Sequence, residues 1–321
     1  MNAAQMTSGA RSDQMKNPPN KPCLRRATRR EFICGVASVG VASLLHGSST
    51  AVNATSYKVG CYTRPWDQFD YRSALDGIAE AGFKYAGIMT AKGKSWLILN
   101  VESSQEDAQK VADEAKQRGL KVLSIYAGEF PVERSVEAGI AGLRTLIDHC
   151  AVCGCPDLML AGTSNEGLVK DYCRVVSECC DYAATKGVRL SIKPHGGANA
   201  TGPQCRQLIQ CVGHPNFKLW YDPGNIFYYS DGTIDPADDS TSVDGLVAGV
   251  SVKDFRRPKE VMVTPGDGEV SFTKVFTNLR KGGFVSGPVL IECLARPNTA
   301  AEITREAKRA RAFIEKTLAA L

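Results

Sequence analysis

Short β-rich runs alternate with amphipathic helical stretches along most of this chain, and that alternation limits the possible folds more than any other feature. Eight runs have the branched and aromatic composition of strands: Tyr57–Tyr62, Lys84–Met89, Lys121–Tyr126, Asp157–Ala161, Arg189–Lys193, Lys218–Asp222, Gly249–Lys253 and Val289–Cys293. Apolar residues recur at helical spacing between most of them, as in Tyr71–Ala81, Gln105–Arg118, Val136–Cys150, Glu166–Lys186 and Ala300–Leu318. Strands that alternate with helices form parallel sheets, so the pattern predicts an α/β protein.

The ends of the helical stretches support this alternation. Several stretches end in a glycine just before the next strand, and glycine accepts the left-handed conformation that closes a helix: Gly82, Gly119, Gly187 and Gly283. Asp235-Pro236 is typical of a helix start. The residues 238–241 that follow are poor helix formers, so we expect the sixth helix to be the weakest.

The number of strand–helix units favours a closed barrel over an open sheet. Eight units within the 267 residues 55–321 match a (β/α)8 TIM barrel, which typically needs about 250 residues. The alternative is a doubly wound open sheet, but no GxGxxG sequence follows the first strand. No linker interrupts this part of the chain, so 55–321 is predicted to be a single domain.

The net charge of +5 lies in the first 54 residues, which contain seven basic and two acidic side chains. The other 267 residues balance 32 basic against 32 acidic groups, so we expect no nucleic-acid partner. Arg29-Arg30 precedes a short apolar run, Ile33–Leu45, and small residues follow at Ala51 and Ala54. This order resembles a twin-arginine signal peptide over 1–54, recognised by the Tat export machinery, and predicts an exported, periplasmic protein. The apolar run is too short for a permanent membrane span.

Polar and charged residues end the last four predicted strands, where a barrel of this kind carries its chemistry. Neighbouring strands stand about 4.8 Å apart, so these ends can converge on one small site. The residues concerned are Lys193 and His195 after the fifth strand, Asp222 and Asn225 after the sixth, Ser251, Lys253 and Arg256 at the seventh, and Glu292 at the eighth.

At these strand ends the sequence resembles the sugar phosphate isomerase/epimerase family, whose members have a xylose isomerase-like TIM barrel. The stretches that carry the resemblance are GVRLSIKPHGG, YDPGN, SVKDF, PGDGEVSF and GPVLIE, and it extends over essentially all of residues 55–321. The resemblance implies isomerisation or epimerisation of a sugar or keto-sugar by proton transfer next to a carbonyl. It also implies one divalent metal (Mn, Mg or Zn), held by Glu, Asp, His and Glu at strands five to eight.

Two of these four ligand positions depart from the family pattern. Asp222 and Glu292 match it, whereas Lys193 and Ser251 occupy the positions of the first Glu and the His. In a first interpretation the metal survives on Asp222, Glu292 and His195. In a second, the Lys193 ammonium replaces the metal between the two carboxylates. In a third, Lys193 loses its proton and acts as a base or Schiff-base nucleophile.

The roles that follow are predictions. We assign catalysis to Glu292, as the base, with His195 and Lys193. We assign contacts with a small-molecule sugar to Lys253, Arg256, Asn225 and Trp66; Trp66 and Arg64 follow the first strand, where an aromatic ring could stack on a sugar face. A 3-keto-glycoside lyase and a non-catalytic sugar-binding barrel remain the alternatives, and a homo-oligomer is compatible with the sequence.

Overall fold

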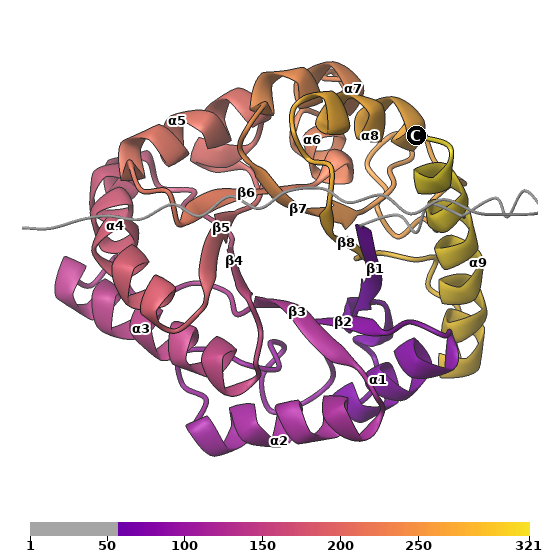
Figure 1. Ribbon diagram of the computed structural model, residues 1–321, viewed down its shortest axis with the longest axis horizontal. Helices are drawn as coiled ribbons and strands as arrows, with labels where there is room; N and C mark the ends of the chain where they lie inside the picture. Colours follow the sequence, from indigo (N-terminus) through magenta and orange to yellow (C-terminus); the bar gives the residue numbers. More distant parts are fainter. Residues whose placement is uncertain (1–56) are drawn as a thin grey trace, which may run out of the picture. The chain divides into compact units, whose positions relative to one another are not determined.

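Eight parallel strands close into a barrel in a computed structural model that describes residues 57–321 (Figure 1). The strands follow one another around the barrel in chain order: β1 Tyr57–Tyr62, β2 Tyr85–Ile88, β3 Lys121–Tyr126, β4 Asp157–Leu160, β5 Arg189–Ile192, β6 Phe217–Tyr221, β7 Val247–Val252 and β8 Gly287–Ile291. Strand β1 pairs with β8 from Tyr57↔Gly287 to Cys61↔Ile291, which closes the sheet. The predicted TIM barrel is therefore confirmed, while the predicted signal peptide lies outside the described residues.

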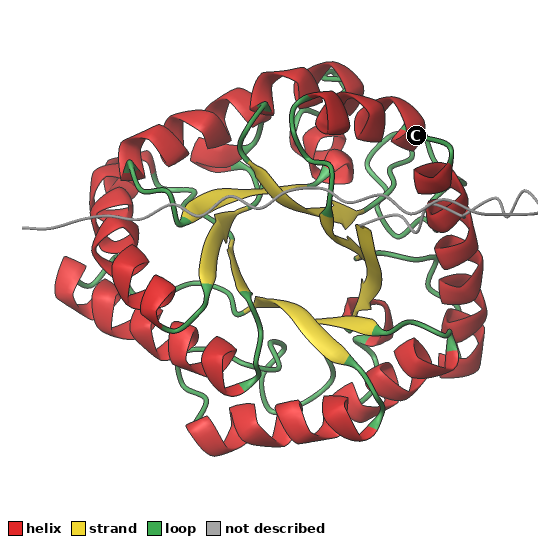
Figure 2. Ribbon diagram, in the orientation of Figure 1, coloured by secondary structure: helices red, strands yellow, loops and turns green. Residues whose placement is uncertain are grey.

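Helices form a ring around the outside of this sheet (Figure 2). Their bounds are α1 Tyr71–Glu80, α2 Gln105–Gln117, α3 Val136–Val152, α4 Val169–Thr185, α5 Gly202–Val212, α6 Pro223–Tyr229, α7 Pro236–Asp239, α8 Phe272–Lys281 and α9 Ala300–Ala319. Short 3-10 turns also occur: η1 Arg64–Trp66, η2 Glu166–Leu168, η3 Gly197–Asn199 and η4 Ser240–Val243. The sixth unit is divided among α6, α7 and η4, as its poor helix formers predicted.

Local sequence signals set the ends of these helices. Ser104, Thr201 and Thr299 each form a capping box with the acidic or amide residue three positions later. Gly82, Gly119, Gly187 and Gly283 all have positive φ, which confirms their predicted place between a helix and the following strand. In residues 57–321 no helix combines the length and the apolar character that a membrane span requires.

The inside of the barrel is a packed core and not a channel. It is filled by a cluster of buried side chains from six of the eight strands or their ends: Tyr62, Met89, Leu123, Met159, Trp220 and Leu290. Glycine makes room for the largest of them, since a Cβ atom at Gly249 would lie 2.4 Å from the Trp220 ring. A substrate must therefore bind at an end of the barrel, where the strands give way to loops.

Candidate functional site

Four charged side chains meet at the carboxyl ends of the last four strands, and we call this group the charge cluster. Lys193 directly follows β5, Asp222 follows β6, Lys253 is the first residue after β7 and Glu292 is the first after β8. All four residues are at least 97% buried. Burial of four ionised groups costs free energy unless the groups are paired, so each ammonium must lie close to a carboxylate.

The charges of the cluster alternate in sign. The Lys193 Nζ lies 2.9 Å from Asp222 Oδ2 and 2.5 Å from Glu292 Oε2. The Lys253 Nζ lies 3.1 Å from the same Asp222 oxygen and 2.7 Å from Glu292 Oε1. Each ammonium thus contacts both carboxylates, and each carboxylate contacts both ammonium groups. The structure places Lys193 between Asp222 and Glu292, which is the geometry that the second interpretation required.

Hydrogen bonds from the barrel interior fix the Glu292 carboxylate. The Ser251 hydroxyl donates to Glu292 Oε2 at 2.6 Å, and Trp220 Nε1 donates to the Ser251 oxygen at 3.1 Å. All three side chains are fully buried. Ser251, which occupies the position of a family metal ligand, therefore positions Glu292 and connects the charge cluster to the core.

The YDPGN sequence builds the other side of the cluster. Asp222 is the N-cap of α6, and its Oδ1 accepts a hydrogen bond from the Asn225 backbone N–H at 2.9 Å. This leaves Oδ2 for the two lysines. Gly224 lets the Lys253 chain pass, because a Cβ atom there would lie 2.6 Å from Lys253 Cγ and 2.7 Å from its carbonyl oxygen. The Asn225 amide accepts from Lys253 Nζ at 2.9 Å and donates to the Pro194 carbonyl at 2.6 Å.

The two lysines differ in their proton affinity although they share the same partners. Burial lowers the pKa of Lys193, and the Lys253 charge adds to this against the opposing effect of Asp222 and Glu292. Burial acts the same way on Lys253, but there the charges of Asp222 and Glu292 prevail and its pKa is raised. Burial alone would raise the pKa of Glu292, yet Lys193, Lys253 and Arg64 together hold it well below its ordinary value.

Partly exposed rings lie on the solvent side of the charge cluster. The His195 ring stands between Tyr126 and Tyr229, with ring centroids 6.2 Å and 5.5 Å away. Burial, followed by the charges of Lys193 and Lys253, lowers the pKa of His195 to about 4, so its imidazole is neutral at pH 7. Burial and the Glu292 charge raise the pKa of Tyr126 to about 12. His195 and Tyr126 are therefore neutral hydrogen-bonding groups at pH 7.

The structure does not bring every predicted site residue into this group. Trp66 is fully buried, donates from Nε1 to the Ala300 carbonyl at 3.4 Å, and packs in the core. Arg256 is exposed and its guanidinium donates to the Asp267 carbonyl at 3.0 Å, in the loop between β7 and α8. The sequence predicts no role for Arg64, two residues before Trp66, yet its Nη1 lies 3.9 Å from Glu292 Oε1.

The side chains present do not fit the divalent metal that the family resemblance implied. Both oxygens of Glu292 and the free oxygen of Asp222 face the amines of Lys193 and Lys253. The raised pKa of Lys253 keeps its amine protonated, so that it repels a cation and cannot ligate it. Within the described part of the chain, no three His, Cys, Asp or Glu side chains are grouped as a metal site would need. The predicted ligand set of Asp222, Glu292 and His195 therefore meets a positive charge where the metal would lie.

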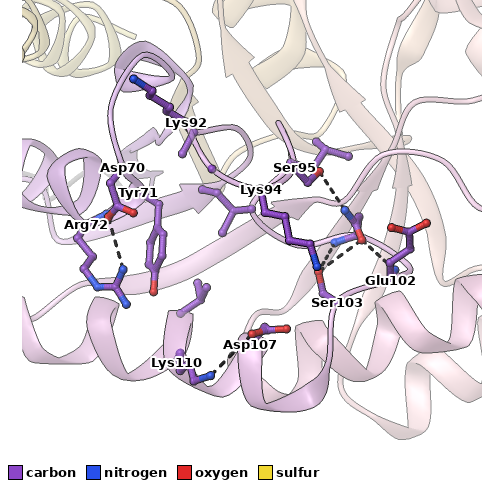
Figure 3. A pocket seen from close by; sticks show the side chains of 16 residues that line it. Asp70, Tyr71, Arg72, Lys92, Lys94, Ser95, Glu102, Ser103, Asp107 and Lys110 are labelled. Carbon is purple, nitrogen blue, oxygen red and sulfur yellow. Dashed lines mark hydrogen bonds and ion pairs between the residues drawn. The ribbon is translucent and has the colours of Figure 1, made fainter.

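A separate cavity of about 430 Å³ opens on the surface beside α1 and α2 (Figure 3). Charged side chains such as Arg72, Lys94 and Asp107 line it, and Lys110 Nζ lies 3.8 Å from Asp107 Oδ1 at its floor. This cavity shares no lining residue with the charge cluster. It is therefore a feature of the surface distinct from the predicted site.

Comparisons with known proteins agree with the fold. Residues 75–317 match the family model described as xylose isomerase-like TIM barrel. A search of curated proteins found no match. Among solved structures, a D-psicose 3-epimerase crystallised in the presence of D-fructose is 16% identical, with a TM-score of 0.66, and the alignment covers 82% of this chain and 99% of that one.

Two further epimerase structures give a similar result. A D-allulose 3-epimerase from Methylomonas sp. is 18% identical with a TM-score of 0.63, over 82% of this chain and 98% of that chain. An L-ribulose 3-epimerase is 15% identical with a TM-score of 0.62, over 82% and 94%. At such identities the similarity establishes the fold, and the chemistry has to be argued from the residues of this chain.

Proposed function

Because this chain belongs to the xylose isomerase-like TIM barrel family, we propose that it is a sugar or keto-sugar isomerase or epimerase in which a pair of buried lysines occupies the metal position. The observation that carries the proposal is the charge cluster: two ammonium groups held between Asp222 and Glu292 where the strands end. The solved D-psicose, D-allulose and L-ribulose 3-epimerases, which share this fold, support the same reaction class.

Proton removal next to a carbonyl leaves an enediolate, whose oxygen carries negative charge. A fixed positive charge beside that oxygen stabilises it most where water is excluded. Lys253 meets this requirement, because its side chain is buried and the two carboxylates raise its pKa, so that it stays protonated. We assign Lys253 the role of supplying the fixed positive charge that stabilises the substrate oxygen on which negative charge develops.

The proton itself needs a group whose charge can change. When the pKa values of two similar groups are shifted in opposite directions, one group can transfer a proton while the other keeps its charge. Here burial lowers the pKa of Lys193, whereas the pKa of Lys253 is raised. Lys193 is therefore our candidate for the proton carrier, with neutral His195 as the hydrogen-bonding partner on the other side of the substrate.

Glu292 receives a different role from the one the sequence predicted. A carboxylate whose pKa is held well below its ordinary value is a weak base. Its four contacts with Lys193, Lys253, Ser251 and Arg64 suit a group that orients the amines. In this proposal Glu292 keeps the lysines in place and stays ionised throughout.

The test is hydrogen exchange in D2O on protein treated with a chelator. Ketohexoses and ketopentoses are incubated with the protein, and NMR follows loss of the C–H signal next to the carbonyl together with any product. We expect exchange by the wild type, and a loss of about 100-fold or more in Lys193→Met, the range for removal of a general acid–base group. Lys110→Met, on the exposed face of α2, is the matched control and should exchange at the wild-type rate.

The outcomes separate the alternatives. Exchange that survives in Lys193→Met would overturn the role of Lys193. Binding of sugars without exchange would favour a non-catalytic sugar-binding barrel, a reading supported by the complete mutual pairing of the four charges. Exchange followed by loss of a glycosidic substituent from a 3-keto-glycoside would identify the lyase, which begins with the same proton abstraction.

A further inference from the structure

Arg64 is the least satisfied charged group around the candidate site. Its side chain is 20% exposed, and its contact with the charge cluster is the single long approach of 3.9 Å to Glu292 Oε1. Its Nε is buried without a hydrogen-bond partner. A guanidinium has five N–H donors, and a buried donor left unpaired costs about 1–3 kcal/mol. The side chain is thus oriented and desolvated in advance of a partner.

The surroundings of Arg64 contain more positive than negative charge. When both lysines of the charge cluster are protonated they balance the two carboxylates, and Arg64 then adds an unmatched positive charge. The nearby Asp67 does not supply the missing negative charge, because its Oδ2 is paired with Arg296 Nη2 at 2.5 Å. Glu129, whose charge acts on Tyr126, is exposed to solvent. An anionic ligand would complete the balance.

The exposed ring of Trp96 lies next to Arg64 on its solvent side. The Arg64 guanidinium lies 6.0 Å from the centroid of the Trp96 ring, and Trp96 is 55% exposed, one of the two large apolar side chains that stand out on the described surface. An arginine stacked on an aromatic ring keeps its N–H edge free for a planar, bidentate partner. The open ring face suits the apolar side of a pyranose or of an extended sugar chain.

We infer that the substrate carries a carboxylate, as a sugar acid or a keto-sugar acid does, and that Arg64 binds this group beside Trp96. The inference rests on the proposed function for the position of the reacting carbons at the charge cluster. A carboxylate matches the fork of the guanidinium with two parallel N–H···O bonds, whereas a neutral hydroxyl accepts one. Arg64 is then a specificity-determining residue, and the substrate carboxylate lies apart from the carbons that react at Lys193 and Lys253.

Paired probes that differ in the carboxylate test this inference. D-Glucuronate and D-galacturonate are compared with D-glucose and D-galactose by calorimetric titration of the full chain. We expect both acids to bind more tightly than the neutral sugars, and Arg64→Gln to weaken acid binding by about 10- to 100-fold while leaving neutral-sugar binding unchanged. Arg64→Lys should keep part of the preference, because it retains the charge without the fork. Arg72→Gln, an exposed arginine on α1, is the matched control.

The results distinguish the inferred carboxylate site from the proposed isomerase reaction. Equal affinity for acids and neutral sugars, or no binding of either acid, would overturn the inference. Arg64→Gln that weakens acids and neutral sugars alike, or Arg64→Lys that behaves like Arg64→Gln, would show a structural role only. Selective acid binding without hydrogen exchange would support the inference while overturning the isomerase. Exchange on neutral ketoses, together with equal affinity for the acids and the neutral sugars, would do the reverse.

Discussion

His195 is held in its neutral form by its neighbours, and this has a measurable effect on stability. Its pKa is about 4 in the folded protein, because of burial and the charges of Lys193 and Lys253, against about 6.5 in an unfolded chain. The unfolded state therefore takes up a proton first as the pH falls. The contribution of His195 to stability is complete above about pH 6.5 and is lost progressively as the pH falls toward 4.

We expect His195→Asn to lose less stability on acidification than the wild type. The difference between the two should be on the order of 2 kcal/mol between pH 7.5 and pH 4.5, after allowance for the partial exposure of the ring. Urea unfolding of both proteins at the two pH values measures it, and an NMR titration of the ring gives the pKa directly. A ring that titrates near pH 6.5, or an equal loss of stability in the two proteins, would show that burial and the two lysines do not lower the pKa of His195.

At the scale of elements, one buried carboxylate organises the loop between β7 and α8. Asp254 Oδ1 accepts from the backbone N–H groups of Phe255 and Val270 at 2.8 Å and 3.0 Å. Its Oδ2 accepts from Gly266 and Gly268 at 2.9 Å and 3.0 Å. A Cβ atom at Gly268 would lie 2.3 Å from Asp254 Oδ1, so the glycine is needed for this approach. The SVKDF and PGDGEVSF stretches therefore form one structural unit.

Asp254→Asn should loosen this loop. The asparagine has the same shape, but its amino group cannot accept, so two backbone N–H groups lose their partner at a cost of about 2–4 kcal/mol in the free energy of unfolding. Urea unfolding measures the loss, and hydrogen exchange over residues 264–270 locates it. Asp267→Asn, an exposed residue of the same loop paired with Arg309, is the control and should cost less than about 1 kcal/mol. Equal effects of the two changes would refute the role of Asp254.

Much of the fold was predictable because each element carries its own signal. The predicted ranges of β1 and β3 agree with the structure residue for residue, and those of α1 and α2 end within one residue. Helices α5 and α8 were expected from the alternation, and Gly283 marks the end of α8, but no range was predicted for either; α5 begins with Gly202-Pro203 and α8 spans ten residues. Short helices have few turns in which an apolar period can repeat, so they depend on packing against the sheet.

Residues of the candidate site that directly follow a strand could be predicted from the sequence. A contact between the two ends of the sheet, where β1 pairs with β8, could not. Lys193, Asp222, Lys253 and Glu292 each directly follow a strand, and alternation alone places them at one end. Arg64 meets Glu292 only because β1 pairs with β8, far away in the sequence. Arg64 and Trp66 lie in the same 3-10 turn, and side-chain direction in so short a turn depends on the tertiary contacts of the helices around it.

At the scale of the whole molecule, several features bear on whether the chain folds before or after export. The barrel is complete only when β1 has paired with β8, which is made after most of the chain. The ten cysteines of residues 57–321 are unpaired, and eight of them are buried. Export of an unfolded chain would present these thiols to an oxidising compartment, whereas export after folding keeps most of them out of contact with oxidants. These features favour the twin-arginine route, and we propose that the protein reaches the periplasm by it.

Replacement of Arg29 and Arg30 by lysine in the full chain should stop export without changing the charge of the segment. In a bacterium with a twin-arginine translocase, we expect the wild type in the periplasmic fraction, shortened near Ala51 or Ala54, and the double variant uncleaved in the cytoplasm. The control replaces Arg25 and Arg26 in the same way, which preserves the adjacent pair, and should be exported normally. Fractionation with mass spectrometry of the N-terminus reads out both properties. Residues 55–321 carry no net charge, so the basic charge of the chain lies in the first 54 residues. If export depended only on that charge, both double variants would be exported to the same extent, and this result would exclude the twin-arginine signal.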